Sequence, residues 1–131
     1  MQVVYVNADE ADSALEDDDV KAERRRITET PLGNLVTLNS VVVRRLTKAF
    51  QGAGNRGLIA AVDGLSFGIR RGECFGLLGI NGAGKTTTFQ MLTTDIFPTD
   101  GEAYVNSFSI ICDVRQVAIF IAVKPLCAFQ R

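Results

Sequence analysis

Residues 79–88, with the sequence GINGAGKTTT, constrain the fold of this chain more than any other stretch. Their spacing is G-x-x-x-x-G-K-[ST], in which glycines let consecutive backbone N–H groups turn toward phosphate oxygens at the N-terminus of a helix. The short apolar run at residues 74–78 is typical of a strand buried on both faces. Apolar residues then recur at three- and four-residue spacing from Phe89 to Ile96, which predicts a helix over 84–94. The sequence therefore predicts a strand, a phosphate-binding loop and a helix in succession.

The residue types in this loop match the chemistry of a bound polyphosphate. Gly82 and Gly84 supply the backbone geometry, and the Lys85 ammonium would lie against the β- and γ-phosphates. The Thr86 hydroxyl would be a ligand of Mg²⁺, and Thr87 could donate to the α-phosphate side. An ordinary glycine turn is the alternative interpretation, and the strand-loop-helix context disfavours it. The predicted phosphate site consists of Gly79, Gly82, Ala83, Gly84, Lys85, Thr86 and Thr87.

Charge is distributed unevenly along the chain. Its length of 131 residues suits one small domain with a single core. Residues 1–19 hold seven acidic side chains and no basic one, which leaves 14 basic against 8 acidic residues in the remainder. This excess suits a polyphosphate ligand but is too small and scattered to indicate a nucleic-acid partner.

The cysteines indicate reduced thiols, because Cys74, Cys112 and Cys127 are far apart and the chain has no His to complete a zinc site. We therefore expect no metal other than Mg²⁺. The longest apolar run, residues 117–123, is too short to cross a bilayer, and the N-terminus lacks a signal-peptide pattern. The sequence thus predicts a soluble, intracellular chain.

The first 34 residues are expected to form an acidic and then basic linker, disordered apart from a short helix between Val20 and Ile27. Order should begin near Leu35. A strand is predicted over 38–47 and a second over 58–69, broken at Asp63-Gly64 and joined to the first as a hairpin. Residues 102–106 are a further strand candidate.

These segments together resemble the beginning of an ABC transporter nucleotide-binding domain. The phrase GECFGLLG, with FQMLT after the loop, is similar to subfamily A, the lipid exporters, and DDVKAER resembles the linker ahead of that family's second nucleotide-binding domain. The resemblance covers residues 17–116. The stretches that carry it most clearly are LTKAF at 46–50, AVDGLSF at 61–67 and GECFGLLGINGAGKTT at 72–87.

The resemblance implies an α/β fold: an incomplete P-loop NTPase (ABC ATPase) fold, with an antiparallel β subdomain and the phosphate-loop strand and helix. It implies ATP with Mg²⁺ as ligand, transmembrane domains and a second nucleotide-binding domain as partners, and a place on the cytoplasmic side of a membrane. Phe50 falls where the family stacks an aromatic ring on adenine, with Val62 near the same ring; for both, a plain core position is the alternative. Asn81 would lie close to the γ-phosphate, whereas Asp63 is interpreted as a turn residue.

The chain departs from the family after the loop. The Mg²⁺-sensing glutamine, the Leu-Ser-Gly-Gly-Gln signature, a Walker B strand ending in Asp-Glu and the switch histidine are all missing. We expect a domain over 35–116, an unrelated tail over 117–131, no catalytic residues, and no hydrolysis by this chain alone. Two alternatives stay open: a non-catalytic truncated isoform that associates with the full-length transporter, and another P-loop NTPase. The absence of Asn-Lys-x-Asp disfavours a GTPase.

Overall fold

The fold is built on an antiparallel sheet and a separate pair of parallel strands. The computed structural model describes residues 2–5, 18–79 and 81–123. The larger sheet has four strands in the order β3-β2-β5-β6, and β1 pairs in parallel with β4. The elements are β1 (Gln2–Tyr5), α1 (Asp18–Glu29), α2 (Leu32–Leu38), β2 (Asn39–Gln51), β3 (Leu58–Arg70), β4 (Phe75–Leu78), α3 (Lys85–Leu92), β5 (Asp100–Val105), β6 (Phe108–Ser109) and α4 (Val114–Val123).

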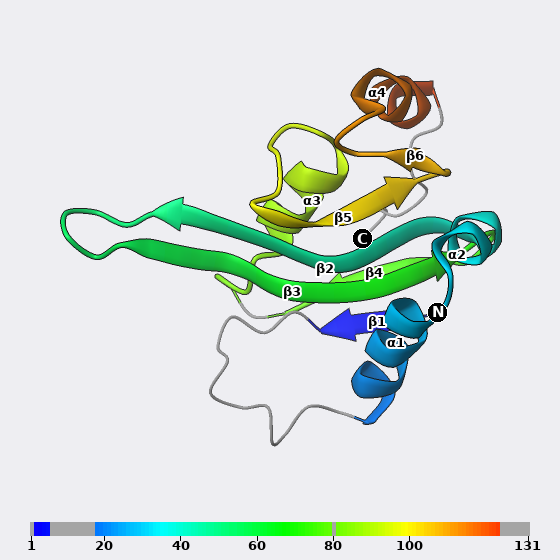
Figure 1. Ribbon diagram of the computed structural model, residues 1–131, viewed down its shortest axis with the longest axis horizontal. Helices are drawn as coiled ribbons and strands as arrows, with labels where there is room; N and C mark the ends of the chain where they lie inside the picture. Colours follow the sequence, from blue (N-terminus) through cyan, green and yellow to red (C-terminus); the bar gives the residue numbers. More distant parts are fainter. Residues whose placement is uncertain (1, 6–17, 80, 124–131) are drawn as a thin grey trace.

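The predicted hairpin is present as β2 and β3, whose outer ends project from the body as an arm (Figure 1). β-Branched residues and interleaved polar positions suit these half-buried strands. The predicted break at Asp63-Gly64 is wrong, because β3 runs on through it. The pairing instead shifts register there, with Gly64 at a φ of 59° in the left-handed region that glycine tolerates.

A β-bulge in β2 decides which side chains face the core. Between Val43 and Thr47 the strand shifts register against both of its neighbours. Arg45 has a φ of 50°, and its N–H donates to Ser66 Oγ at 2.8 Å. Regular alternation from Val43 would place Arg45 on the core face, but Leu46 is buried there instead. The bulge therefore reverses the alternation at Leu46, and the pairing of β2 with β3 shifts register twice more before Ala49.

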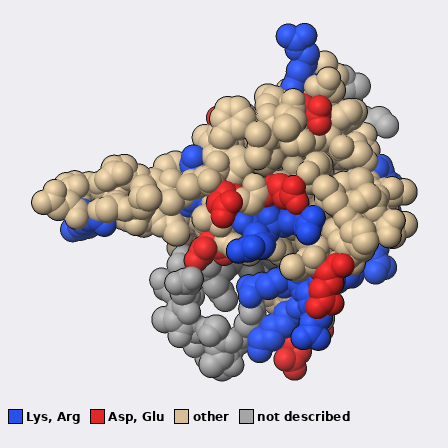
Figure 2. Space-filling model, viewed as in Figure 1, with Lys and Arg blue, Asp and Glu red and all other residues tan. Residues whose placement is uncertain are grey.

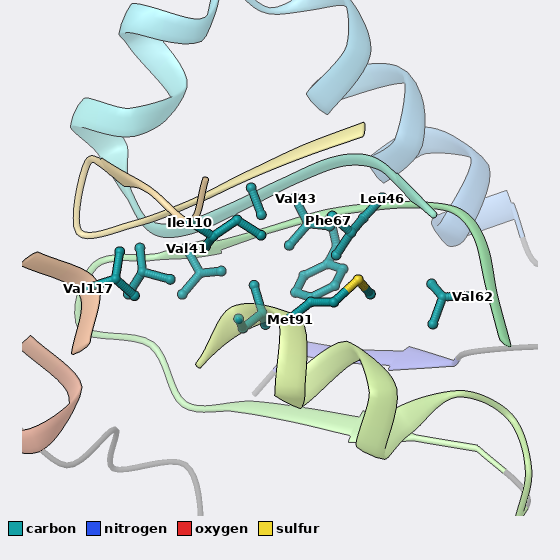
Figure 3. Close-up of a cluster of buried hydrophobic side chains, with 11 residues drawn as sticks. Val41, Val43, Leu46, Val62, Phe67, Met91, Ile110 and Val117 are labelled. Carbon is teal, nitrogen blue, oxygen red and sulfur yellow. The ribbon is translucent and has the colours of Figure 1, made fainter. Parts of the chain in front are cut away.

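The main core lies between the sheet and α3. Val43, Leu46 and Phe67 from the sheet point toward Met91 of the helix (Figure 3). Phe67 also stacks on Phe75 at the start of β4, with ring centroids 4.9 Å apart and an interplanar angle of 7°. This contact fixes the strand ahead of the loop to the antiparallel sheet. Both predicted elements around the loop are confirmed, β4 and α3 being slightly shorter than expected.

The helices α1 and α2 cover the opposite face of the sheet, where Ile27, Leu35 and Val42 form a second buried cluster. Glu23 of α1 accepts a hydrogen bond from the Gly68 N–H of edge strand β3 at 2.9 Å. The expectation of a disordered linker is therefore wrong for residues 18–29, which form α1, and for residues 32–34, which form the beginning of α2. The predicted short helix between Val20 and Ile27 lies within α1, whereas α2 is held by contacts with distant residues and its own composition gave little sign of it. The acidic residues at 9–17 lie outside the described ranges.

The last described helix, α4, begins at Val114 and packs beside β6 (Figure 1). It runs across the predicted boundary at residue 116, and Val117 belongs to the main core. Residues 124–131, which include Cys127, lie outside the described ranges, whereas Cys74 and Cys112 are free and exposed. Within those ranges, no helix combines the length and apolar character needed to span a bilayer.

Candidate phosphate-binding site

The loop between β4 and α3 has the backbone shape that its glycines predict. Gly82 has a φ of 88° and Gly84 a φ of 83°, both in the left-handed region. Gly84 is also the N-cap of α3, and no side chain caps the first turn of this helix. A helix N-terminus of this kind favours an anion, through both its N–H groups and its dipole.

The loop is pressed against β3 at Gly84. A Cβ atom added at Gly84 would lie 2.3 Å from the Ala61 carbonyl oxygen and 2.9 Å from Val62 Cγ2, so a larger residue has no space. Val62 itself is only 3% exposed and lies at one end of the main core (Figure 3). Val62 is therefore a core residue that also lies against the loop.

Lys85 reaches from the start of α3 back to the start of the loop. Its Nζ donates a hydrogen bond to the carbonyl oxygen of Gly79, and the side chain is partly buried. This ammonium places a full positive charge close to the helix N-terminus. An arriving phosphate group would meet it together with the N–H groups of the loop.

The other loop residues differ in exposure. Ala83 is buried at 1% exposure, while Asn81 and Thr86 are exposed and Thr87 is partly buried. The exposed Thr86 hydroxyl on the first turn suits a metal ligand that is completed by phosphate oxygens. Among the described residues, no group of three or more His, Cys, Asp or Glu side chains is placed to hold a metal ion.

Phe50 lies on the projecting arm and not in the core, with 45% of its surface exposed. It pairs with Ile59 across the hairpin, and Lys48, two residues before it, pairs with Val62. Val62 lies against Gly84 of the phosphate loop. The pairing of Lys48 with Val62 therefore places this part of β2 beside the strand segment that contacts the loop.

The sequence reasoning missed Lys48, whose Nζ lies 5.2 Å from the centroid of the Phe50 ring. The same ammonium donates to the Phe97 carbonyl oxygen at 2.7 Å. The only sequence signal was the spacing of Lys48 and Phe50. Two residues apart on a strand, they share one face.

The perturbed pKa values belong to the opposite face of the sheet. Burial, with the hydrogen bond that Tyr104 donates to Glu102, raises the pKa of Tyr104 to about 12. The hydrogen bond to Glu23 raises the pKa of Arg26.

In the face seen in Figure 2, Lys and Arg side chains are interleaved with Asp and Glu, and the projecting arm is largely uncharged.

Residues 62–118 match the ABC transporter family. The chain is 46% identical over 114 residues to the ATP-binding cassette sub-family A member 2 of Homo sapiens, which covers 86% of this chain and 4% of that protein. It is 43% identical over 102 residues to the phospholipid-transporting ATPase ABCA3 of Mus musculus, covering 78% of this chain and 6% of that protein. The retinal-specific phospholipid-transporting ATPase ABCA4 of Homo sapiens is 48% identical over 102 residues, covering 78% of this chain and 4% of that protein.

Solved structures show the same fold. A dimeric bacterial ABC transporter cassette superposes with a TM-score of 0.53 at 22% identity, covering 61% of this chain and 34% of the cassette. A post-hydrolysis state of such a cassette, bound to ADP and Pi, gives a TM-score of 0.52 at 26% identity, covering 59% of this chain and 33% of that one.

The chain spans 4% to 6% of the length of these curated relatives and about a third of the cassettes. The α/β fold that the resemblance implies, an incomplete P-loop NTPase (ABC ATPase) fold, is confirmed by these likenesses. The chain belongs to the ABC transporter family, and it is similar to a small part of each of these subfamily A members.

Proposed function

We propose that the loop after β4 binds the phosphates of ATP together with Mg²⁺. The observation that carries the proposal is the position of the Lys85 ammonium. It donates a hydrogen bond to the Gly79 carbonyl oxygen and lies beside a helix N-terminus that no side chain caps. A triphosphate there would gain a full positive charge and the N–H groups of the loop at the same place.

Each loop residue has a defined part in this proposal. Gly82 and Gly84 shape the backbone, and Lys85 exchanges the Gly79 carbonyl for the β- and γ-phosphates. Thr86 holds Mg²⁺ through its exposed hydroxyl, and Thr87 donates to the α-phosphate side. When bound, Mg²⁺ neutralises charge on the phosphate oxygens. The complete proposed set is Gly79, Asn81, Gly82, Ala83, Gly84, Lys85, Thr86 and Thr87, with Asn81 close to the γ-phosphate.

Phe50 is proposed as the platform for the adenine ring, with Val62 between this ring and the loop. Its 45% exposure supports the proposal, because a stacking platform needs an uncovered face. Base stacking on an aromatic side chain contributes about 1–3 kcal/mol. We predict that Phe50→Ala weakens the binding of ATP and leaves the binding of inorganic triphosphate nearly unchanged. Equal losses for the two ligands, measured by calorimetric titration, would contradict a contact with the base.

We further propose that this chain by itself binds ATP without hydrolysing it. Hydrolysis needs a group that orients water and a second carboxylate for Mg²⁺. The chain has no His, and no apolar run after residue 88 ends in Asp-Glu. Multiple turnovers by the purified chain would instead favour another P-loop NTPase with a different set of catalytic residues.

In the whole protein, the proposed role is to power lipid transport across a membrane from its cytoplasmic side. The names of the relatives, which describe phospholipid-transporting ATPases, support lipid as the substrate class. The proposed partners are transmembrane domains and a second nucleotide-binding domain. No nucleic-acid partner is proposed, because the excess of basic over acidic residues after residue 19 is small.

The test is the binding of a fluorescent ATP analogue with Mg²⁺ to the wild type and to Lys85→Ala. Loss of the ammonium should weaken binding at least about tenfold, because the charge meets phosphate in a partly enclosed site. Lys21→Ala is the matched control, since Lys21 is an exposed lysine on α1. Unchanged binding by Lys85→Ala would refute the assignment of the phosphate loop.

A further inference from the structure

Lys48 joins two parts of the proposed nucleotide site that are far apart in the sequence. The bulge at Arg45 reverses the alternation of β2, so Leu46 and Lys48 share the face that is turned toward α3. Without this reversal, Lys48 would point to the face covered by α1 and α2. The pairing of Lys48 with Val62 agrees, because Val62 belongs to the core on the α3 side.

The Lys48 ammonium makes two contacts at once. Its Nζ lies 5.2 Å from the centroid of the Phe50 ring, within the range of a cation–π interaction. It also donates to the carbonyl oxygen of Phe97 at 2.7 Å, in the segment that follows α3. One charged group thus fixes an exposed ring of the arm to the chain that leaves the phosphate-loop helix.

The segment that Lys48 contacts is itself held in place. The Ala49 N–H donates to Thr99 Oγ1 at 3.0 Å, and the Thr99 N–H donates to the Thr47 carbonyl oxygen at 2.8 Å. The Phe97 carbonyl therefore lies two residues before a point where the chain is hydrogen-bonded to β2. A ring held from this carbonyl loses less conformational freedom when a ligand stacks on it.

We propose that Lys48 is a positioning residue for the base of the nucleotide. It covers one face of the Phe50 ring, fixes the orientation of the ring, and leaves the other face for an adenine base. The proposal rests on the proposed function, since it concerns the base half of the same site. It implies that Lys48 contributes to the binding of a nucleoside triphosphate and not to the binding of triphosphate alone.

The test compares Mg·ATP and Mg·triphosphate binding to Lys48→Met and Lys48→Arg by calorimetric titration. Methionine keeps an unbranched stem and removes the charge and the donor, whereas arginine keeps both. Lys48→Met should weaken ATP about threefold to tenfold and leave triphosphate unchanged, and Lys48→Arg should bind both ligands like the wild type. Lys21→Met, on the opposite face of the sheet, controls for the loss of a lysine.

Separate outcomes overturn separate claims. Equal losses of ATP and triphosphate in Lys48→Met, or no loss of either, would overturn the positioning role alone. If the wild type binds neither ligand, the proposed function fails, and this inference fails with it.

The contact between Lys48 and Phe50 can also be measured without a ligand, because the Phe50 ring current should shift the Lys48 ε-methylene protons upfield in an NMR spectrum. Equal shifts in the wild type and in Phe50→Leu would also overturn the proposal.

Discussion

Replacing Gly84 by alanine tests how tightly the phosphate loop is packed. The added Cβ would lie 2.3 Å from the Ala61 carbonyl oxygen, which is a backbone atom that no side-chain rotation can move away. Alanine must also adopt a φ of 83°, at a cost of about 1–2 kcal/mol. Overpacking adds about 1–3 kcal/mol. We therefore expect Gly84→Ala to lower the free energy of unfolding by about 2–5 kcal/mol, against a total of about 5–15 kcal/mol for a typical domain.

Gly82→Ala is the matched control for this experiment. Gly82 has a φ of 88°, so the conformational cost is the same, but no atom lies within 4 Å of its added Cβ. It should lose only about 1–2 kcal/mol. Urea unfolding followed by circular dichroism measures both variants. If Gly84→Ala and Gly82→Ala are equally stable, the loop does not pack on β3 as described and the reasoning is refuted.

Two further predictions concern the opposite face of the sheet. The pKa of Tyr104 is raised to about 12, so the folded state holds this proton more tightly than the unfolded state, and the stabilisation is lost as the pH rises from about 10 through 12. Tyr104→Phe should therefore lose less stability than the wild type over this pH range in urea titrations, and parallel curves would contradict the shift. Glu23→Gln should lower the free energy of unfolding by about 1–3 kcal/mol, because Glu23 accepts from the Gly68 N–H and holds α1 on β3. Glu29→Gln, which changes an exposed pair, should have almost no effect, and equal losses in the two variants would contradict the role of Glu23.

The elements around the loop could be predicted because their signals are local. The apolar run before Gly79 and the helical spacing from Phe89 mark the strand and the helix directly. The hairpin also has its own signals, in two β-branched runs separated by glycines. For these parts, the local preference of each segment matches the strand or helix that it forms in the structure.

The misses all depend on contacts between distant residues. The charge pattern predicts a short helix between Val20 and Ile27, but not the full length of α1 or its place on the sheet, which the hydrogen bond from the Gly68 N–H to Glu23 holds. The bulge at Arg45 faces Gly101, whose added Cβ would lie 2.1 Å from the Arg45 carbonyl oxygen. Nothing beside Arg45 in the sequence marks this reversal, so the position of Lys48 could not be foreseen.

The central claim is that this chain keeps the phosphate-binding half of a nucleotide site without the chemistry of hydrolysis. The direct measurement is a calorimetric titration of the wild-type chain with Mg·ATP, with phosphate release followed in the same samples. We predict saturable binding, and phosphate release no faster than from ATP in buffer. Binding that Lys85→Ala leaves unchanged, or several turnovers of ATP per chain, would contradict the claim.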